Sequence, residues 1–193
     1  MRILVLICFA VVFFACNQSS TSSSSGINLD AFELKKIEGD GLNLAIKRNT
    51  QGKIIEQGII RDGVKDGLWI TYHDDDNGLP ARIISYASGI QNGPDLKFSN
   101  RGQIEEMSNY FNNQLDGLYG KYRFGRPTMT TEYATGQLDG AHTEYFNNGK
   151  PQKLIEFKDG KQDGLLRYYD EEGNITLEYQ YENGEKVSGG IVK

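Results

Sequence analysis

The chain of 193 residues has few of the residue types on which most catalytic and metal sites depend. It contains two cysteines and two histidines. Cys8 and Cys16 both lie near the N-terminus, so the remaining chain has no cysteine for a disulfide, a metal site or a nucleophile. His73 and His142 lack metal-ligand spacing, and no Gly-x-Ser-x-Gly motif occurs. We therefore expect neither enzymatic activity nor a cofactor.

Positive charge, proline and apolar residues are also scarce. The formal net charge is −5, whereas a nucleic-acid surface needs clustered lysine and arginine to neutralise phosphates. Hydrophobic residues make up 38% of the chain, a share that disfavours a large packed α/β enzyme. Four prolines beside 23 glycines exclude collagen. We expect no nucleic-acid partner.

The only long hydrophobic run lies at the N-terminus. Arg2 precedes an uncharged segment from Ile3 to Ala15. A membrane-spanning helix needs about 20 residues, so this segment is too short to span a bilayer, but it has the length of a secretory signal core. A Ser-rich stretch that is too polar to fold follows it. We expect residues 1–15 to be a signal peptide and residues 16–36 to be a tether and N-terminal cap.

The segment Phe13-Phe14-Ala15-Cys16 resembles the lipobox of bacterial lipoproteins. The resemblance implies cleavage before Cys16, lipidation of that cysteine, and anchoring in the bacterial cell envelope at the outer membrane. Removal of residues 1–15 leaves 20 basic against 26 acidic side chains, because Arg2 is the only charge lost from the 21 basic and 26 acidic residues. We therefore expect the acyl chains, and not charge, to attach the protein to the membrane.

A repeat begins near residue 37 and continues to residue 184. Each unit has an Asp-Gly or Asn-Gly pair, then a single glycine, then a large apolar residue eight positions later, and this regular spacing is typical of repeat architectures. Residues 37–193 are therefore expected to form one repeat domain. Five of the structural glycines that begin the units are Gly67, Gly93, Gly117, Gly140 and Gly164, and the apolar residues are Ile60, Tyr86, Tyr110, Tyr133, Phe157 and Tyr181.

Each unit is predicted to be a β-hairpin. Apolar residues alternate after the first glycine, as Leu68, Ile70 and Tyr72 do, and this is the period of a strand. The Asp-Gly pairs are predicted to form the turns between successive hairpins. The expected fold class is all-β, an elongated single-layer antiparallel sheet of about six stacked hairpins. Residues 27–38 are expected to form one short helix or a capping strand.

The repeat unit resembles the variant MORN repeat of the YwqK-like proteins, bacterial repeat chains that are often labelled antitoxins. The segments Gly63–Tyr72, Gly136–Tyr145 and Gly160–Gly173 carry this resemblance, which extends over about residues 41–184. It implies a non-enzymatic binding scaffold without a cofactor, whose protein partner would be a toxin or effector that the scaffold neutralises by occlusion. The resemblance supplies no catalytic residues.

Aromatic residues are the candidate partner-binding residues. A single-layer sheet has no second layer to cover them, and tyrosine and tryptophan contribute strongly to binding at protein interfaces. The alternative is that these rings only pack within the sheet. Trp69 is the foremost candidate. The full set is Trp69, Tyr119, Tyr72, Tyr122, Tyr145 and Tyr169.

Other functions remain open at this stage. The chain could be a structural or glycan-binding surface lipoprotein, its repeats could bind lipid, or it could be an enzyme. The acidic run Asp74-Asp75-Asp76 could supply oxygen ligands to Ca²⁺, but it lacks the ligand array of an EF-hand and is interpreted as a solvated turn. The sequence favours no particular oligomeric state.

Overall fold

The computed structural model describes residues 27–39 and 41–192, so the predicted signal peptide, Cys16 and the Ser-rich stretch lie outside the described residues. No helix in the described ranges is both long and apolar enough to cross a membrane. The elements are η1 (Leu29–Ala31), β1 (Glu33–Lys36), β2 (Leu42–Arg48), β3 (Ile54–Arg61), β4 (Val64–Tyr72), β5 (Pro80–Ala87), β6 (Ile90–Phe98), β7 (Ile104–Phe111), β8 (Gln114–Leu115), β9 (Gly117–Arg123), β10 (Arg126–Ala134), β11 (Gln137–Tyr145), β12 (Pro151–Lys158), β13 (Lys161–Tyr169), β14 (Ile175–Glu182) and β15 (Glu185–Ile191).

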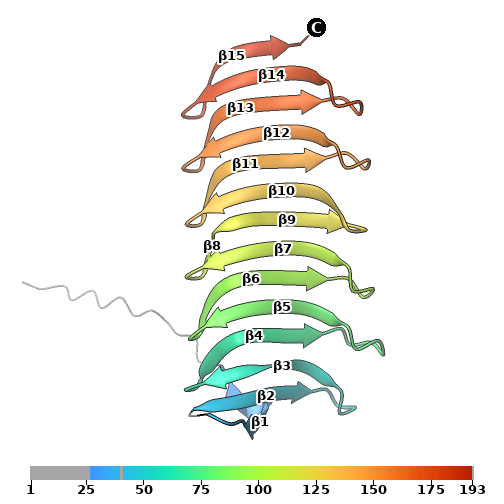
Figure 1. The fold of residues 1–193 in the computed structure, drawn as a ribbon, viewed down its shortest axis with the longest axis vertical. Helices are drawn as coiled ribbons and strands as arrows, with labels where there is room; N and C mark the ends of the chain where they lie inside the picture. The colour runs from blue at the N-terminus through green and yellow to red at the C-terminus, as the bar shows by residue number, and fades with distance from the viewer. Residues whose placement is uncertain (1–26, 40, 193) are drawn as a thin grey trace, which may run out of the picture.

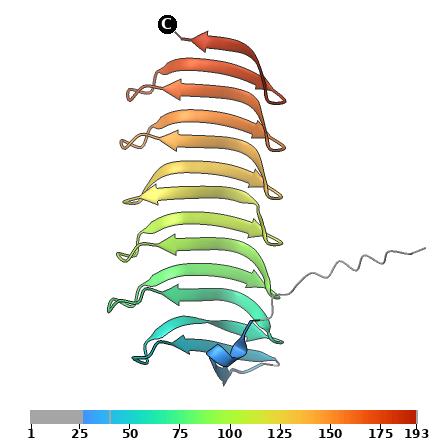
Figure 2. The same ribbon diagram turned by 180° about the vertical axis from the view of Figure 1, so that it is seen from behind.

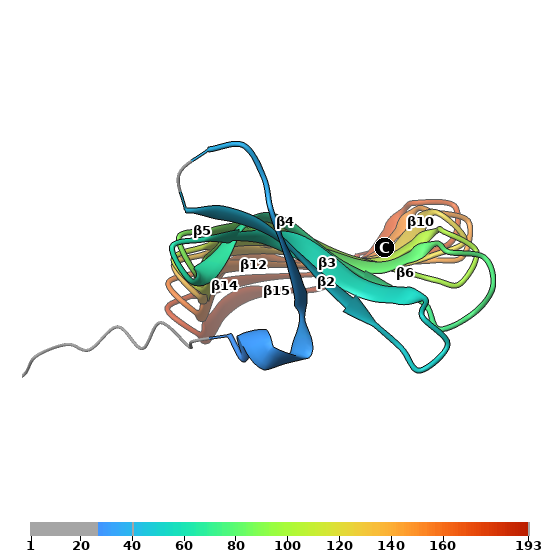
Figure 3. The ribbon, with the colours of Figure 1, turned by 90° about the horizontal axis from the view of Figure 1, so that it is seen from below.

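The strands form one antiparallel sheet of 15 strands in sequence order, except that the short β8 pairs only with β7, which also pairs with β9. Figures 1 and 2 show the strands stacked into an elongated ladder, and Figure 3 shows that the ladder is a single layer. The predicted all-β sheet of stacked hairpins is confirmed. Each strand contacts chiefly its neighbours in sequence, so stability is close to a sum over hairpins and their junctions.

The turns between hairpins do not lie where the sequence predicted them. Asp66-Gly67 lies inside β4, and the turn before β4 is formed by Asp62-Gly63, in which both residues have positive φ (50° and 82°). Two positive φ angles are typical of the tight hairpin turn that matches strand twist. The prediction that the Asp-Gly pairs form these turns is therefore wrong. The corresponding turns are Ser88-Gly89, Asn112-Asn113, Thr135-Gly136, Asp159-Gly160 and Asn183-Gly184.

The Asp-Gly pairs instead lie at bulges in the strands. At the first of them, β4 advances four residues, from Asp66 to Ile70, while β3 advances two, from Ile59 to Gln57. Gly67 has a φ of +65°, which a residue with a Cβ rarely adopts. On its other side Gly67 pairs with Tyr86 of β5. The same pairing of a repeat glycine with an aromatic residue recurs in Gly93–Tyr110, Gly117–Tyr133, Gly140–Phe157 and Gly164–Tyr181.

The aspartate of each pair links one hairpin to the next. The carboxylate of Asp66 accepts a hydrogen bond of 3.2 Å from the backbone N–H of Ser88, in the following turn. A carboxylate in this position satisfies a turn N–H that the strand ladder does not use. The need for a short side chain with an acceptor oxygen explains why aspartate recurs. The equivalent bonds run from Thr135 to Asp116, from Asp159 to Asp139 and from Asn183 to Asp163.

Acid pH is expected to weaken these links. Hydrogen bonds from Arg61 and then from the Ser88 N–H lower the pKa of Asp66, and Lys158 and then the Asp159 N–H lower that of Asp139. A lowered folded-state pKa contributes stability that is complete above the ordinary aspartate value of about 3.9 and is lost as pH falls through the lowered value. Urea unfolding followed by circular dichroism should therefore show a lower midpoint at about pH 3 than at about pH 6.

The matched control for this pH dependence is the double variant Asp66→Asn and Asp139→Asn. Asparagine keeps an acceptor oxygen but does not ionise, so the fall in the unfolding midpoint between the two pH values should be smaller than in the parent protein. An equal fall in both proteins would show that these two carboxylates contribute nothing to the acid sensitivity.

The N-terminal segment covers one face of the sheet at its first hairpins. Strand β1 pairs with β2, and η1 packs against the face of the sheet (Figure 3). Residues 27–38 thus form both a short 3₁₀ helix and a capping strand. The Phe32 ring meets Trp69 edge-on, with centroids 5.6 Å apart. The covered cluster consists of Ala45, Ile60 and Trp69, with Ile27, Leu29, Phe32 and Tyr86 packed around it.

Candidate functional site

Strand register determines which aromatic residues share a face. Trp69 pairs with Ile84, two positions before Tyr86, so Trp69 and Tyr86 lie on one face. Tyr119 pairs with Thr131 of β10 and meets Tyr133 edge-on, with centroids 6.4 Å apart. We call this side of the sheet the aromatic face. It is defined by Tyr86, Tyr110, Tyr119, Tyr133, Phe157 and Tyr181, together with Trp69.

The other predicted contact residues lie on the opposite face. The Tyr72 hydroxyl accepts a hydrogen bond of 2.6 Å from Gln57, and the hydroxyls of Tyr145 and Thr130 are 3.1 Å apart. Trp69 and Tyr72 are three residues apart, and an odd separation places two residues of a strand on opposite faces. The six candidates therefore do not form one surface. Tyr72, Tyr122, Tyr145 and Tyr169 lie on the face opposite to Trp69 and Tyr119.

Trp69 belongs to the core and not to an accessible surface. Its side chain is 2% exposed, and its Nε1–H donates a hydrogen bond of 3.0 Å to the Ile59 carbonyl. The Lys65 ammonium lies 4.0 Å from the centre of the ring. A Cβ on Gly58 would collide with the indole, so the close approach of this ring requires glycine at that position. The expectation that Trp69 contacts a partner is therefore corrected.

The rest of the aromatic face is open. The N-terminal cover reaches Tyr86, and beyond β5 no described segment lies over the face (Figure 2). The rings on this part are half-buried by their neighbours in the sheet. Partial burial raises the pKa of Tyr119, because the charged phenolate is disfavoured away from water. The open rings are those of Tyr110, Tyr119, Tyr133, Phe157 and Tyr181.

A buried ion pair occupies the same face, beside the covered end. The Arg82 guanidinium donates two hydrogen bonds to Asp95, of 2.8 and 2.5 Å, and the carboxylate is 3% exposed. These bonds raise the pKa of Arg82. The spacing of residues in the sequence did not predict this ion pair. The available signal was that Asp95, two residues after Gly93, occupies the repeat position that holds Trp69 and Tyr119 in other units.

Further charged and polar side chains form a band along this face. Lys97 pairs with Glu106 at 2.8 Å. His142 Nδ1 lies 2.8 Å from the Thr131 hydroxyl, and Lys153 lies 3.4 Å from Glu144. This band gives the open part of the face a mixed pattern of charge. Residues 27–39 and 41–192 contain no group of three or more histidine, cysteine, aspartate or glutamate side chains that could hold a metal ion.

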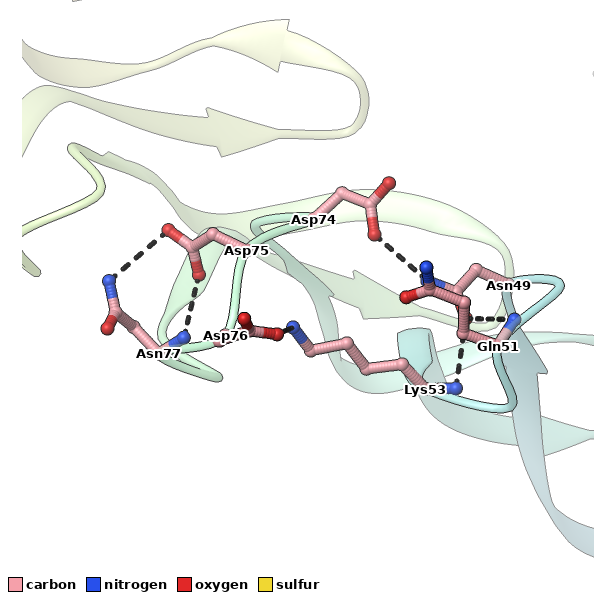
Figure 4. A network of polar contacts seen from close by, with 7 residues as sticks. All are labelled: Asn49, Gln51, Lys53, Asp74, Asp75, Asp76 and Asn77. Carbon is pink, nitrogen blue, oxygen red and sulfur yellow. Dashed lines mark hydrogen bonds and ion pairs between the residues drawn. The ribbon is translucent and has the colours of Figure 1, made fainter.

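The acidic run at the β4–β5 connection bonds to its own surroundings. Asp74 accepts a hydrogen bond of 2.9 Å from the Asn49 side chain, and the Asp76 carboxylate lies 3.4 Å from the Lys53 ammonium (Figure 4). Asp75 accepts a bond from the backbone N–H of Asn77, within the same turn. The three carboxylates point to different partners, which fits a turn that is joined to the neighbouring loop.

Comparisons with known proteins add little to this geometry. No protein-family model and no curated protein matches the chain. One similar solved structure is a mutant of S. aureus TarM in complex with fondaparinux, alpha-GlcNAc-glycerol and UDP. The sequence identity is 9%, and the TM-score is 0.24. The matched region spans 83% of this chain but only 22% of the TarM chain.

Proposed function

We propose that this protein is a non-enzymatic scaffold that binds another protein on the open part of its aromatic face. The observation that supports this best is the position of its own N-terminal segment. That segment lies on the same face over β2 to β5, where the edge-on contact of Phe32 with Trp69 anchors it. The face beyond β5 has the same repeating architecture but no described cover.

The chemistry of the open face suits a protein partner. Tyrosine rings such as Tyr133 offer a large apolar area and lose little conformational freedom on binding. The ion pairs of Lys97 and Lys153 on the same face supply a charge pattern that a partner must complement, which favours specificity. The elongated sheet would allow contact along several hairpins at once.

Two further parts of the proposal rest on the sequence. The hairpin repeat and its glycine spacing support membership of the variant MORN-repeat class, and Cys16 supports a lipid anchor in the cell envelope. A scaffold anchored in this way would hold its partner at the membrane. Occlusion of a toxin or effector is the form of binding that the resemblance implies.

Site-directed photocrosslinking tests the proposed face. A photoreactive phenylalanine analogue at Tyr133 of the full-length protein should crosslink to one protein in the cells that make the chain. The same analogue at Tyr122 is the matched control, because this tyrosine lies on the opposite face. With the captured protein purified, Phe157→Ala should weaken binding by about 2 kcal/mol, the typical cost of removing an aromatic anchor.

Three results would contradict the proposal. The first is the absence of a protein adduct at Tyr133. The second is equal adducts from Tyr133 and Tyr122, which would indicate random collision. The third is an adduct with glycan or lipid in place of protein, which would favour the other functions considered for the sequence.

A further inference from the structure

The β9–β10 hairpin differs from the others at the strand ends that are joined by the long loops. The connections 49–53, 73–79, 99–103, 146–150 and 170–174 contain five or seven residues, whereas β9 and β10 are joined by Phe124 and Gly125 alone (Figure 1). Counted from equivalent strand pairs, Tyr122–Pro127 here and Tyr145–Pro151 in the next hairpin, this connection is one residue shorter. A groove lies on each side of Phe124, with volumes of about 450 and 460 Å³.

The two grooves have one arginine and one aromatic side chain in common. Arg123 and Phe124 line both grooves. The groove toward β7 adds Arg101 and Ile104, and the groove toward β12 adds Arg126 and Phe146. Glu105 is the one carboxylate that lines them. The local charge is therefore positive, in a chain whose formal net charge is −5.

Phe124 is an unusual residue for the turn that it occupies. Its φ is +52°, and its side chain is 74% exposed. Bulky residues rarely adopt positive φ, and the other turn residues that do so here, apart from glycine, are aspartate, serine, asparagine and threonine. An exposed ring in a strained backbone conformation contributes little to folding. Such residues are characteristic of functional sites.

The arginines of the grooves are those that the fold leaves without an acidic partner. Among the described residues, the arginines elsewhere in the sheet each form an ion pair, namely Arg48, Arg61, Arg82 and Arg167. Arg101, Arg123 and Arg126 form none within the described ranges; Arg126 donates a hydrogen bond of 3.1 Å to the Asn147 carbonyl. All three lie at the grooves.

We propose that these grooves bind an acidic peptide segment of a partner protein, with carboxylates on the three arginines and an apolar side chain against Phe124. The planar guanidinium matches a carboxylate through two parallel hydrogen bonds. Three cations are fewer than the phosphate contacts of a typical nucleic-acid site, and the exposed ring favours a peptide with an apolar residue. The grooves lie at the loops that join the strand ends, and so this inference does not depend on the function proposed for the aromatic face.

A labelled peptide with three glutamates on each side of one leucine tests the proposal. Fluorescence anisotropy with the full chain should show saturable binding at low salt, weaker binding at about 150 mM salt, and none for the same peptide with glutamine in place of glutamate. The triple variant Arg101→Gln, Arg123→Gln and Arg126→Gln should weaken binding about tenfold. Lys161→Gln, at an exposed position on the other edge, should leave the affinity unchanged.

Phe124→Asn tests the contribution of the aromatic ring to binding separately from that of the arginine charges. Asparagine adopts positive φ readily, so this variant should fold at least as well as the parent and still bind the peptide about tenfold more weakly. Circular dichroism checks each fold, and Arg123→Gln alone replaces the triple variant if that protein does not fold. The proposal is overturned if the glutamate peptide does not bind saturably, or if Lys161→Gln weakens binding as much as the arginine variants do. It is also overturned if oligodeoxythymidylate binds more tightly than the peptide and its affinity is unchanged by Phe124→Asn.

Discussion

Replacement of Trp69 by alanine is expected to lower the free energy of unfolding of the first hairpins by about 3 to 5 kcal/mol, the usual cost of truncating a large buried aromatic residue. The indole fills the space above Gly58, packs against Phe32 and donates a hydrogen bond to the Ile59 carbonyl. Alanine would leave a cavity beneath the N-terminal segment and would remove the hydrogen bond to the Ile59 carbonyl. We also expect that segment to detach from the face.

Tyr119→Ala is the matched control for this substitution, because Tyr119 occupies the same repeat position but is only half-buried. Its cost should be about 1 kcal/mol. Urea unfolding followed by circular dichroism measures the stability, and hydrogen exchange should show faster exchange in β2 to β5 than in β10 to β14 for Trp69→Ala. Equal costs for the two variants would refute the assignment of Trp69 to a local core.

Replacement of Asp95 by alanine is expected to cost about 2 to 3 kcal/mol. Removal of one member of a buried ion pair leaves the other charge without a partner, which typically costs about 3 to 5 kcal/mol. The Arg82 side chain is 39% exposed, so water can solvate part of its charge and the cost falls below that range. Gln91, which donates a hydrogen bond of 3.1 Å to Asp95, also loses its acceptor.

A double variant separates the charge from the packing. Arg82→Leu with Asp95→Leu removes both charges and fills the space with apolar atoms, so it should regain most of the stability that Asp95→Ala loses. Urea unfolding of Arg82→Leu, of Asp95→Leu and of the double variant gives the coupling energy. A double variant less stable than Asp95→Ala would show that the residues act separately.

Local spacing predicted the elements better than it predicted their junctions. The period of two after each glycine correctly indicated strands, and the repeat of about two dozen residues correctly indicated stacked hairpins. Asp66-Gly67 and the neighbouring Asp62-Gly63 both have suitable turn chemistry, so residue type alone does not distinguish a turn from a bulge here. Only the paired strands show that the first is a bulge and the second is the turn.

For the candidate binding residues too, some features follow from the sequence and others only from the tertiary structure. The odd separation of Trp69 and Tyr72 already placed them on opposite faces, so their grouping was a misinterpretation that the sequence alone could have prevented. The burial of Trp69 was different, because it depends on Phe32, which is distant in sequence, and on Gly58 in the neighbouring strand. The pairing of Arg82 with Asp95 also depends on the register between β5 and β6.

The amino-acid sequence by itself determined the all-β class, the hairpin repeat and the spacing of its glycines, because these follow from alternation and backbone freedom within a few neighbouring residues. The tertiary structure alone decided which face is covered, which charges are paired and where Phe124 and its arginines are left exposed. These features depend on strand register and on contacts between segments far apart in the chain, and a shift in register would move each side chain to different partners.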